Sequence, residues 1–203
     1  MNEELFSGYV LEGGKSSRMK TDKAFLEIGG ITFVQRAAEA LVSLFEKRVK
    51  IVLSHTQTGF IERLPENIPY IFDRYENCGA LGGIHAALTD CETKYALILA
   101  VNLPLVTADA IGNLVKITGA SNEINAVAPR QIDGRLQPLC AVYQACFCLP
   151  PLEDLLNETA NSSVQSFLGT ITALFVDQNK IAPDDSKDIF YNVNRPADFE
   201  SIK

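Results

Sequence analysis

The stretch GYVLEGGKSSRMKTDK, residues 8–23, decides how this chain folds. Its first five residues, 8–12, form a short apolar run that predicts a buried β-strand, and two adjacent glycines follow the run directly. The segment from Thr32 to Glu46 then places apolar residues at helical spacing, and a second apolar run follows at 49–54. A strand, a loop, a helix and a strand in this order predict a parallel pair of strands with a crossover helix.

The rest of the chain continues this alternation of short apolar runs and longer amphipathic segments. We expect further strands at 69–73, 95–102, 125–130, 139–144 and 172–177, and helices at 80–89, 108–117, 151–169 and 196–203. The Pro150-Pro151 pair is interpreted as the start of the 151–169 helix, because proline suits a first helical turn. The sequence therefore predicts an α/β fold of three layers, a mainly parallel twisted sheet with helices on both faces, in one domain over residues 1–203.

Composition excludes several functional classes. A formal charge of −7 disfavours general nucleic-acid binding, and only two histidines are available for a zinc site or a histidine-based triad. The five cysteines lack CxxC spacing, which favours buried free thiols. The acidic start of the chain and its short apolar runs predict neither a signal peptide nor a membrane span, so we expect a cytoplasmic protein.

The loop after the first strand carries the clearest functional signal. Adjacent glycines let the backbone approach a ligand closely and point its N–H groups at phosphate. Within nine positions the loop also holds four basic residues, which is unusual in an acidic chain: Lys15, Arg18, Lys20 and Lys23. The segment therefore predicts a local phosphate-binding site.

Two common glycine patterns do not fit this loop. A P-loop requires glycine five residues before Gly14, and Tyr9 stands there, with Gly8 one position away. The dinucleotide pattern G-x-G-x-x-G also fails, because the two glycines are adjacent and serines follow. An NTPase of the P-loop class and a nicotinamide enzyme are therefore disfavoured.

The loop does resemble the signature L-A-G-G-x-S-x-R-M-G-x-D-K of small nucleotidyltransferases, in the version of the molybdenum cofactor guanylyltransferases. Glu12 and Lys20 replace its usual Ala and Gly, and eight residues match it in order and spacing: Leu11, Gly13, Gly14, Ser16, Arg18, Met19, Asp22 and Lys23. Three further segments resemble later motifs of the family: Asp73 with residues 78–84, Gln137-Pro138-Leu139, and residues 192–198.

The resemblance implies a Rossmann-like fold of the nucleotide-diphospho-sugar transferase type, with GTP and molybdopterin cofactor as substrates and Mg²⁺ as cofactor. It leaves room for a protein that delivers the molybdopterin, and it includes no role for nucleic acid or membrane. Arg18 and Lys23 are the implied catalytic residues. The implied nucleotide-binding residues are Leu11, Gly13, Gly14, Lys15, Ser16, Lys23, Asp73, Gly79, Leu81 and Asn102.

One residue departs from the family pattern at the expected metal site. The resemblance implies an aspartate at the end of the 95–102 run that binds Mg²⁺, whereas this chain has Asn102. An amide oxygen remains a possible ligand without the negative charge that Mg²⁺ prefers, and Asp73 is a candidate to supply that charge. The family's asparagine near the base is also missing, since residues 52–55 read VLSH.

Three functional hypotheses remain open at this point. The first is transfer of GMP from GTP to molybdopterin cofactor, and the second is transfer from CTP or another nucleotide to a different acceptor. The third is a nucleotide-binding relative without catalysis, motivated by Asn102. Some residues also have structural alternatives: Asp22 as a helix cap, Gly79, Gly82 and Gly83 as turn or packing positions, and Asn194 as the start of the last helix.

Overall fold

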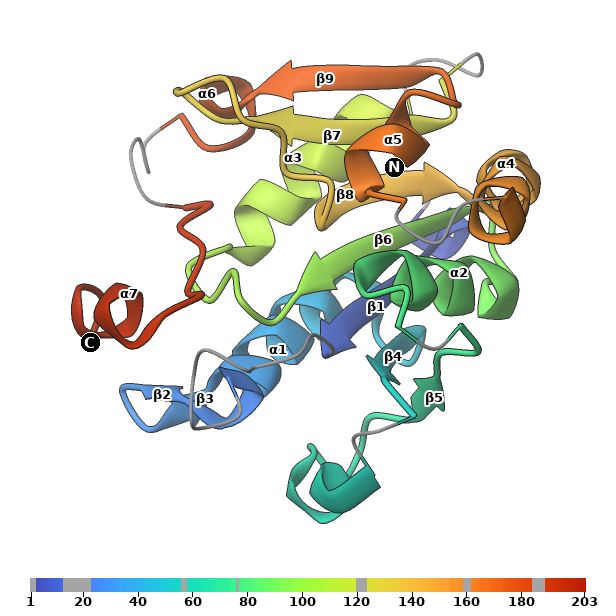
Figure 1. Ribbon diagram of the computed structural model, residues 1–203. Helices are drawn as coiled ribbons and strands as arrows, with labels where there is room; N and C mark the ends of the chain where they lie inside the picture. Colours follow the sequence, from blue (N-terminus) through green and yellow to red (C-terminus); the bar gives the residue numbers. More distant parts are fainter. Residues whose placement is uncertain are drawn as a thin grey trace.

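A seven-stranded sheet forms the centre of the protein in a computed structural model that describes residues 3–12, 23–55, 58–75, 77–119, 124–158, 162–183 and 189–203 (Figure 1). The strand order is β5-β4-β1-β6-β8-β7-β9, and every neighbouring pair is parallel except the two pairs that β8 makes, with β6 and with β7. The strands are β1 (Phe6–Glu12), β4 (Val49–Leu53), β5 (Tyr70–Phe72), β6 (Tyr95–Ala100), β7 (Ala126–Arg130), β8 (Cys140–Gln144) and β9 (Ala173–Asp177).

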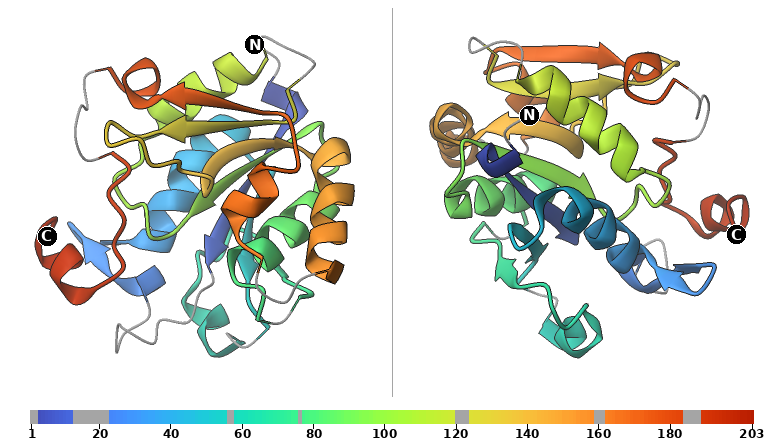
Figure 2. Two further views of the ribbon diagram at one scale, coloured as in Figure 1. Left: turned by 45° about the horizontal axis from the view of Figure 1, so that its top comes forward. Right: turned by 180° about the vertical axis from the view of Figure 1, so that it is seen from behind.

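Helices cover both faces of this sheet, which confirms the predicted three-layer α/β fold (Figure 2). One face carries α1 (Phe33–Phe45), α3 (Ala108–Thr118) and α6 (Gln178–Ile181), and the other carries α2 (Ala80–Asp90), α4 (Ala145–Glu158) and α5 (Val164–Leu168). The smaller elements are a hairpin of β2 (Glu27–Ile28) and β3 (Ile31–Thr32), the 3-10 turns η1 (Glu3–Leu5), η2 (Lys23–Phe25) and η3 (Thr58–Arg63), and the last helix α7 (Pro196–Glu200).

Strand β1 lies in the middle of the sheet and packs against both helix layers. Alternate side chains of a strand point to opposite faces, and here Phe6 and Val10 join the core beneath α1, while Tyr9 and Leu11 join the core beneath α2. Gly8 lies on the α1 face, where a Cβ atom would stand 2.9 Å from Cδ2 of Phe45. The glycine that misses the P-loop position therefore allows α1 to approach the sheet.

Helix α4 begins earlier than the sequence predicts. The Pro150-Pro151 pair lies inside the helix and does not start it; the first helical residue is Ala145, directly after β8. The two prolines lack the N–H groups that would bond the carbonyls of Cys146 and Phe147, and both of these residues are exposed, so water can satisfy the carbonyls. The expected helix over 151–169 is divided into α4 and α5, with Ser163 capping the second.

The reversed strand β8 was not predicted, and a hairpin explains it. The chain turns back after β7 around Gly134, whose φ of 85° suits glycine in a tight hairpin turn. The turn is closed by hydrogen bonds from Gln131 N to Arg135 O (2.8 Å) and from Gly134 N to Gln131 O (2.9 Å). Strand β8 consequently returns between β6 and β7 and pairs antiparallel with both.

Candidate active site

A pocket opens where the carboxyl ends of β1, β4 and β6 meet, the edge at which parallel α/β sheets bind ligands. It has a volume of about 620 Å³, including space open to solvent. Its lining is mixed and contains both apolar and polar residues: Leu11, Glu12, Lys23, Val52, Leu53, Ser54, Asp73, Gly79, Ala80, Gly83, Ala100, Val101, Asn102 and Leu139.

Five residues expected in the nucleotide site line this pocket together: Leu11, Lys23, Asp73, Gly79 and Asn102. They come from four separate parts of the chain and are brought together only by the sheet. Leu81, in contrast, is 2 % exposed and packs in the core beneath α2, below the pocket and not in its wall. The remaining expected residues lie outside the described part of the chain: Gly13, Gly14, Lys15, Ser16 and Arg18.

Sequence reasoning missed several residues that the structure places in the wall. Val52 and Ala100 have apolar side chains without a functional signal, Ser54 and Leu139 lie in segments compared with family motifs but not assigned to the site, and Glu12 stands out in the sequence only as a departure from the motif. Four of these five stand at or just past the carboxyl end of β1, β4 or β6, and Leu139 immediately precedes β8, which pairs antiparallel with β6. Their position relative to the strands was therefore the available signal.

Asp73 defines one end of the pocket. The residue is 8 % exposed, and its Oδ1 accepts a hydrogen bond from the backbone N–H of His55 at 3.3 Å. Gly82 lets α2 come close to this carboxylate, because a Cβ there would lie 3.3 Å from Asp73 Oδ2 and 3.0 Å from Tyr75 O. The His55 ring stacks on Phe72 with centroids 5.3 Å apart, so the aspartate is held between ordered neighbours.

Asn102 defines the other end. Its Nδ2 donates to Oδ1 of Asn192 (3.3 Å) and to Oδ1 of Asn194 (3.2 Å), and Lys23 Nζ donates to the same Asn194 oxygen at 3.1 Å. These bonds fix the orientation of the Asn102 amide. Its own Oδ1 is buried and has no hydrogen-bond partner among the residues that the structure describes.

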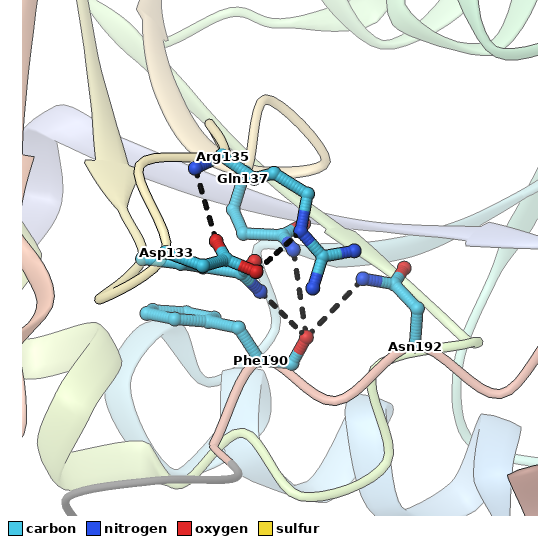
Figure 3. A network of polar contacts seen from close by, with 6 residues as sticks. Asp133, Arg135, Gln137, Phe190 and Asn192 are labelled. Atoms are coloured by element: carbon cyan, nitrogen blue, oxygen red, sulfur yellow. Dashed lines mark hydrogen bonds and ion pairs between the residues drawn. The ribbon is translucent and has the colours of Figure 1, made fainter.

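Hydrogen bonds hold the C-terminal segment that carries these asparagines against the edge of the sheet where the pocket lies. Val193 N donates to Asn102 O at 2.9 Å, and the Phe190 carbonyl accepts from Nε2 of Gln131 (2.9 Å), Nε2 of Gln137 (3.4 Å) and Nδ2 of Asn192 (3.2 Å) (Figure 3). Two segments that resemble separate family motifs, around 137 and around 192, thus meet at one carbonyl.

Asn194 lies at the start of the last helix, as its structural alternative predicts, and also contacts residues of the pocket wall. Its backbone N–H donates to Asp198 Oδ2 at 2.8 Å, next to the Arg195 N–H at 2.7 Å, which caps the start of α7. Its side chain meanwhile bridges Lys23 and Asn102 at the pocket.

Asp73 is not placed to replace the missing charge at Asn102. The strand order puts β5, which leads to Asp73, three strand spacings from β6, which leads to Asn102. Neighbouring strands lie about 4.8 Å apart, which makes the separation roughly 14 Å. Oxygen ligands of one Mg²⁺ lie about 2.1 Å from the ion, so these two residues cannot share it. The suggestion that Asp73 assists the metal at Asn102 is therefore wrong.

The donors at the Asn102 end do fit a hard cation. Mg²⁺ takes oxygen ligands, commonly one or two carboxylates with substrate phosphates. An oriented amide oxygen without a partner is present at Asn102, and Glu12, a carboxylate that is 4 % exposed, stands on the adjacent strand β1. No cluster of three or more His, Cys, Asp or Glu side chains suited to a metal occurs in the described ranges.

The cysteines are all free, yet they are not uniformly buried as expected. Cys140 and Cys148 are buried, and burial raises the pKa of each thiol to about 12. Cys146 is exposed, and Cys78 and Cys91 are partly buried. Among the described residues, no helix is both long and apolar enough to cross a membrane.

The sheet, its two helix layers and a pocket at the carboxyl strand ends define an α/β protein of the nucleotide-diphospho-sugar transferase type. Solved structures share this fold. A molybdopterin-guanine dinucleotide biosynthesis protein A from Archaeoglobus fulgidus superposes with a TM-score of 0.81 at 20 % identity, covering 97 % of this chain and 96 % of the other. A 2-C-methyl-D-erythritol 4-phosphate cytidylyltransferase from Thermus thermophilus gives 0.68 at 14 % identity, covering 97 % and 96 %.

Residues 8–173 match the MobA-like NTP transferase domain, and the chain belongs to this family of nucleotidyltransferases. Curated relatives extend the similarity over nearly the full length. A probable molybdenum cofactor guanylyltransferase from Geobacillus sp. (strain WCH70) is 28 % identical over 97 % of each chain. One with the same description from Clostridium perfringens (strain 13 / Type A) is 30 % identical over 97 % of this chain and 95 % of its own.

Proposed function

We propose that this protein transfers GMP from GTP to the phosphate of molybdopterin cofactor and releases pyrophosphate. An oxygen of the molybdopterin phosphate forms a bond to the α-phosphorus of GTP as the bond from that phosphorus to the β-phosphate oxygen breaks. The nucleophile is ionised near neutral pH, so the reaction requires no general base, in keeping with a chain that has two histidines. The observation that carries the proposal is the pocket that joins Asp73, Lys23 and Asn102 in a member of this family.

Each end of the pocket has a distinct task in this reaction. Lys23 presents an ammonium group beside Asn194, where it would neutralise phosphate charge that moves onto the leaving pyrophosphate. Asp73, held by the His55 backbone, lies at the far end and would accept hydrogen bonds from the base or ribose. The apolar strand ends between them would exclude water from the nucleoside.

Mg²⁺ belongs to the same proposal. A bound Mg²⁺ would supply positive charge that offsets the negative charge developing on the departing pyrophosphate. Asn102 would offer its Oδ1, which the bonds to Asn192 and Asn194 already orient. Arg18 and the other loop residues, Gly13, Gly14, Lys15 and Ser16, would complete the phosphate site. The cytoplasmic location and a delivery protein for molybdopterin stay predictions.

Transfer from CTP or another nucleotide is the second candidate, because the chain has Ser54-His55 where the family places an asparagine near the base. A nucleotide-binding protein without catalysis is the third, because Asn102 carries no charge. The measurement that separates them is pyrophosphate release in the presence of Mg²⁺ and a molybdopterin-bearing acceptor, with GTP, CTP, ATP or UTP supplied in turn.

Release from GTP alone is the expected result. Release from CTP would favour the second candidate, and nucleotide binding without release in the unmodified chain, with release restored in Asn102→Asp, would favour the third. The assignment would be overturned if the protein bound no nucleotide and released no pyrophosphate.

A further inference from the structure

Glu12 is a buried carboxylate in the wall of the nucleotide pocket. It ends β1 and is 4 % exposed, although burial of a carboxylate is unfavourable unless a charge or a hydrogen-bond donor meets it. The loop motif that this chain resembles has alanine at the position. The end of β1 therefore places a carboxylate where the proposed reaction would bring substrate phosphates, and a divalent cation between them would relieve their mutual repulsion.

The neighbouring strand places Glu12 beside Asn102. Leu11 pairs with Ala100 in the parallel register of β1 and β6, and Val101 N donates to Leu11 O at 3.1 Å. Glu12 and Asn102 are the residues immediately beyond Leu11 and Val101, so they leave the sheet on adjacent strands about 4.8 Å apart. The pocket wall contains two carboxylates. Asp73 follows β5, which lies three strand spacings from β6, whereas Glu12 ends β1, which is directly adjacent to β6.

The pleat also directs Glu12 toward the side of the sheet where Lys23 lies. Side chains alternate along β1, so Glu12 points to the same face as Val10. Val10 packs in one core with Ala24 and Phe25 of η2, the turn that begins with Lys23. Lys23 and Asn102 both bond Asn194, and the geometry thus gathers a carboxylate, an ammonium and an oriented amide at one end of the pocket.

We propose that Glu12 supplies the carboxylate ligand of the divalent cation and shares the site with Oδ1 of Asn102. In this assignment, the negative charge that the resemblance implies at residue 102 is supplied from the adjacent strand. The inference rests on the proposed function for the identity of the bound phosphates. Its alternative is a structural one, in which Glu12 only stabilises the carboxyl end of β1.

Binding of Mn²⁺, followed by the loss of the free-ion signal in electron paramagnetic resonance, tests the proposal without any turnover. The protein is titrated without nucleotide and again with GTP. Glu12→Gln, which keeps size and removes charge, is expected to weaken Mn²⁺ binding by at least about tenfold. Glu12→Gln combined with Asn102→Asp returns the charge to residue 102 and is expected to restore affinity. Glu27→Gln, at an exposed acid of β2, is the matched control and leaves binding unchanged.

Unchanged Mn²⁺ affinity in Glu12→Gln would overturn the proposal, as would a wild-type protein that binds no Mn²⁺ with or without GTP. If Glu12→Gln does not fold, cleavage of the unmodified chain by bound Fe²⁺ with ascorbate and peroxide replaces it. Cuts are then expected near both residue 12 and residue 102, and cuts near 102 alone would contradict the assignment. Failure of pyrophosphate release with Glu12-dependent Mn²⁺ binding would reject the proposed reaction and leave the metal site standing.

Discussion

The orientation of the Asn102 side-chain amide is fixed by its hydrogen-bonded neighbours. Its Nδ2 faces two acceptor oxygens, those of Asn192 and Asn194, and the Asn192 amide nitrogen is itself engaged by the Phe190 carbonyl. The amide therefore has one orientation that satisfies its donors, and in this orientation Oδ1 is buried with no hydrogen-bond partner among the described residues, in a side chain that lines the pocket. This geometry suits a neutral amide side chain at residue 102. A carboxylate there would place an oxygen against the acceptor oxygens of Asn192 and Asn194.

Asn102→Asp is expected to lower the free energy of unfolding by about 1–2 kcal/mol in EDTA, because a carboxylate oxygen then faces the oxygens of Asn192 and Asn194. Millimolar Mg²⁺ is expected to recover most of the loss. Urea unfolding with EDTA and with Mg²⁺ measures both effects. Asn113→Asp, which breaks a hydrogen bond to Ile181 O away from the pocket, serves as control and gains nothing from Mg²⁺.

Lys23→Ala is expected to weaken GTP binding by about 10- to 100-fold, the effect of losing a charge-assisted contact of about 1.5–3 kcal/mol. Isothermal titration with GTP and Mg²⁺ measures it. Lys116→Ala removes a similar lysine-to-asparagine hydrogen bond, of 3.2 Å to Asn113, on the surface of α3 and is expected to leave affinity unchanged. Equal affinities for the two variants would exclude Lys23 from the nucleotide site.

Among the elements, β1 and α1 set the depth at which the pocket forms. Phe45 and Leu41 of α1 approach the backbone of β1 at Gly8, and the same strand ends at the pocket with Leu11 and Glu12. A shift of α1 away from the sheet would therefore be transmitted to the core that holds η2 and Lys23.

Gly8→Ala is expected to destabilise the protein by about 1–3 kcal/mol, because its Cβ would lie 2.9 Å from Phe45 Cδ2 and the helix must move. Gly112→Ala provides the contrast: it lies within α3, where a Cβ meets only Leu44 Cδ2 at 3.8 Å, and it is expected to stabilise by up to about 1 kcal/mol. Urea unfolding compares them, and a Gly8→Ala protein as stable as wild type would show that α1 packs less closely than described.

At the scale of the whole molecule, the interior holds several ionisable groups in their neutral form. Cys140 and Cys148 have pKa values raised to about 12 by burial, and burial also raises the pKa of Tyr9 and Tyr143. The unfolded thiols ionise near pH 9.0. Above that pH the folded chain binds more protons than the unfolded chain, so stability falls as pH rises from about 9 toward 12.

The free energy of unfolding is therefore expected to drop by about 1.4 kcal/mol per buried thiol between pH 8 and pH 10. Urea unfolding at the two pH values measures the drop, and the double variant Cys140→Ala and Cys148→Ala should lose correspondingly less over the same interval. An equal drop in the free energy of unfolding in variant and wild type would show that these thiols do not cause the loss of stability at alkaline pH. Cys146→Ala, at the exposed thiol, is the control and keeps the wild-type loss.

The sequence predicted most of the fold correctly because local patterns sufficed for it. The apolar runs and the amphipathic segment 32–46 appear as strands and as α1, which Thr32 caps through the Gln35 N–H at 3.2 Å. Its errors came where tertiary contacts overrule local preference. Pro150 and Pro151 fit inside α4 because the carbonyls left without an N–H partner belong to exposed residues. The turn at Gly134 reverses β8, and its second, antiparallel pairing with the distant strand β6 has no local signal.

The order of motifs along the chain determined by itself the class of fold, the family, and a set of residues suited to bind phosphate. These depend on residue type and spacing, which the sequence states directly. Only the tertiary structure decided which of those residues meet: it joined Lys23, Asn102 and Asn194, placed Leu81 in the core, and set the strands that lead to Asp73 and Asn102 three strand spacings apart. Strand order causes the difference, since hydrogen bonding between distant strands sets how far apart their carboxyl ends lie.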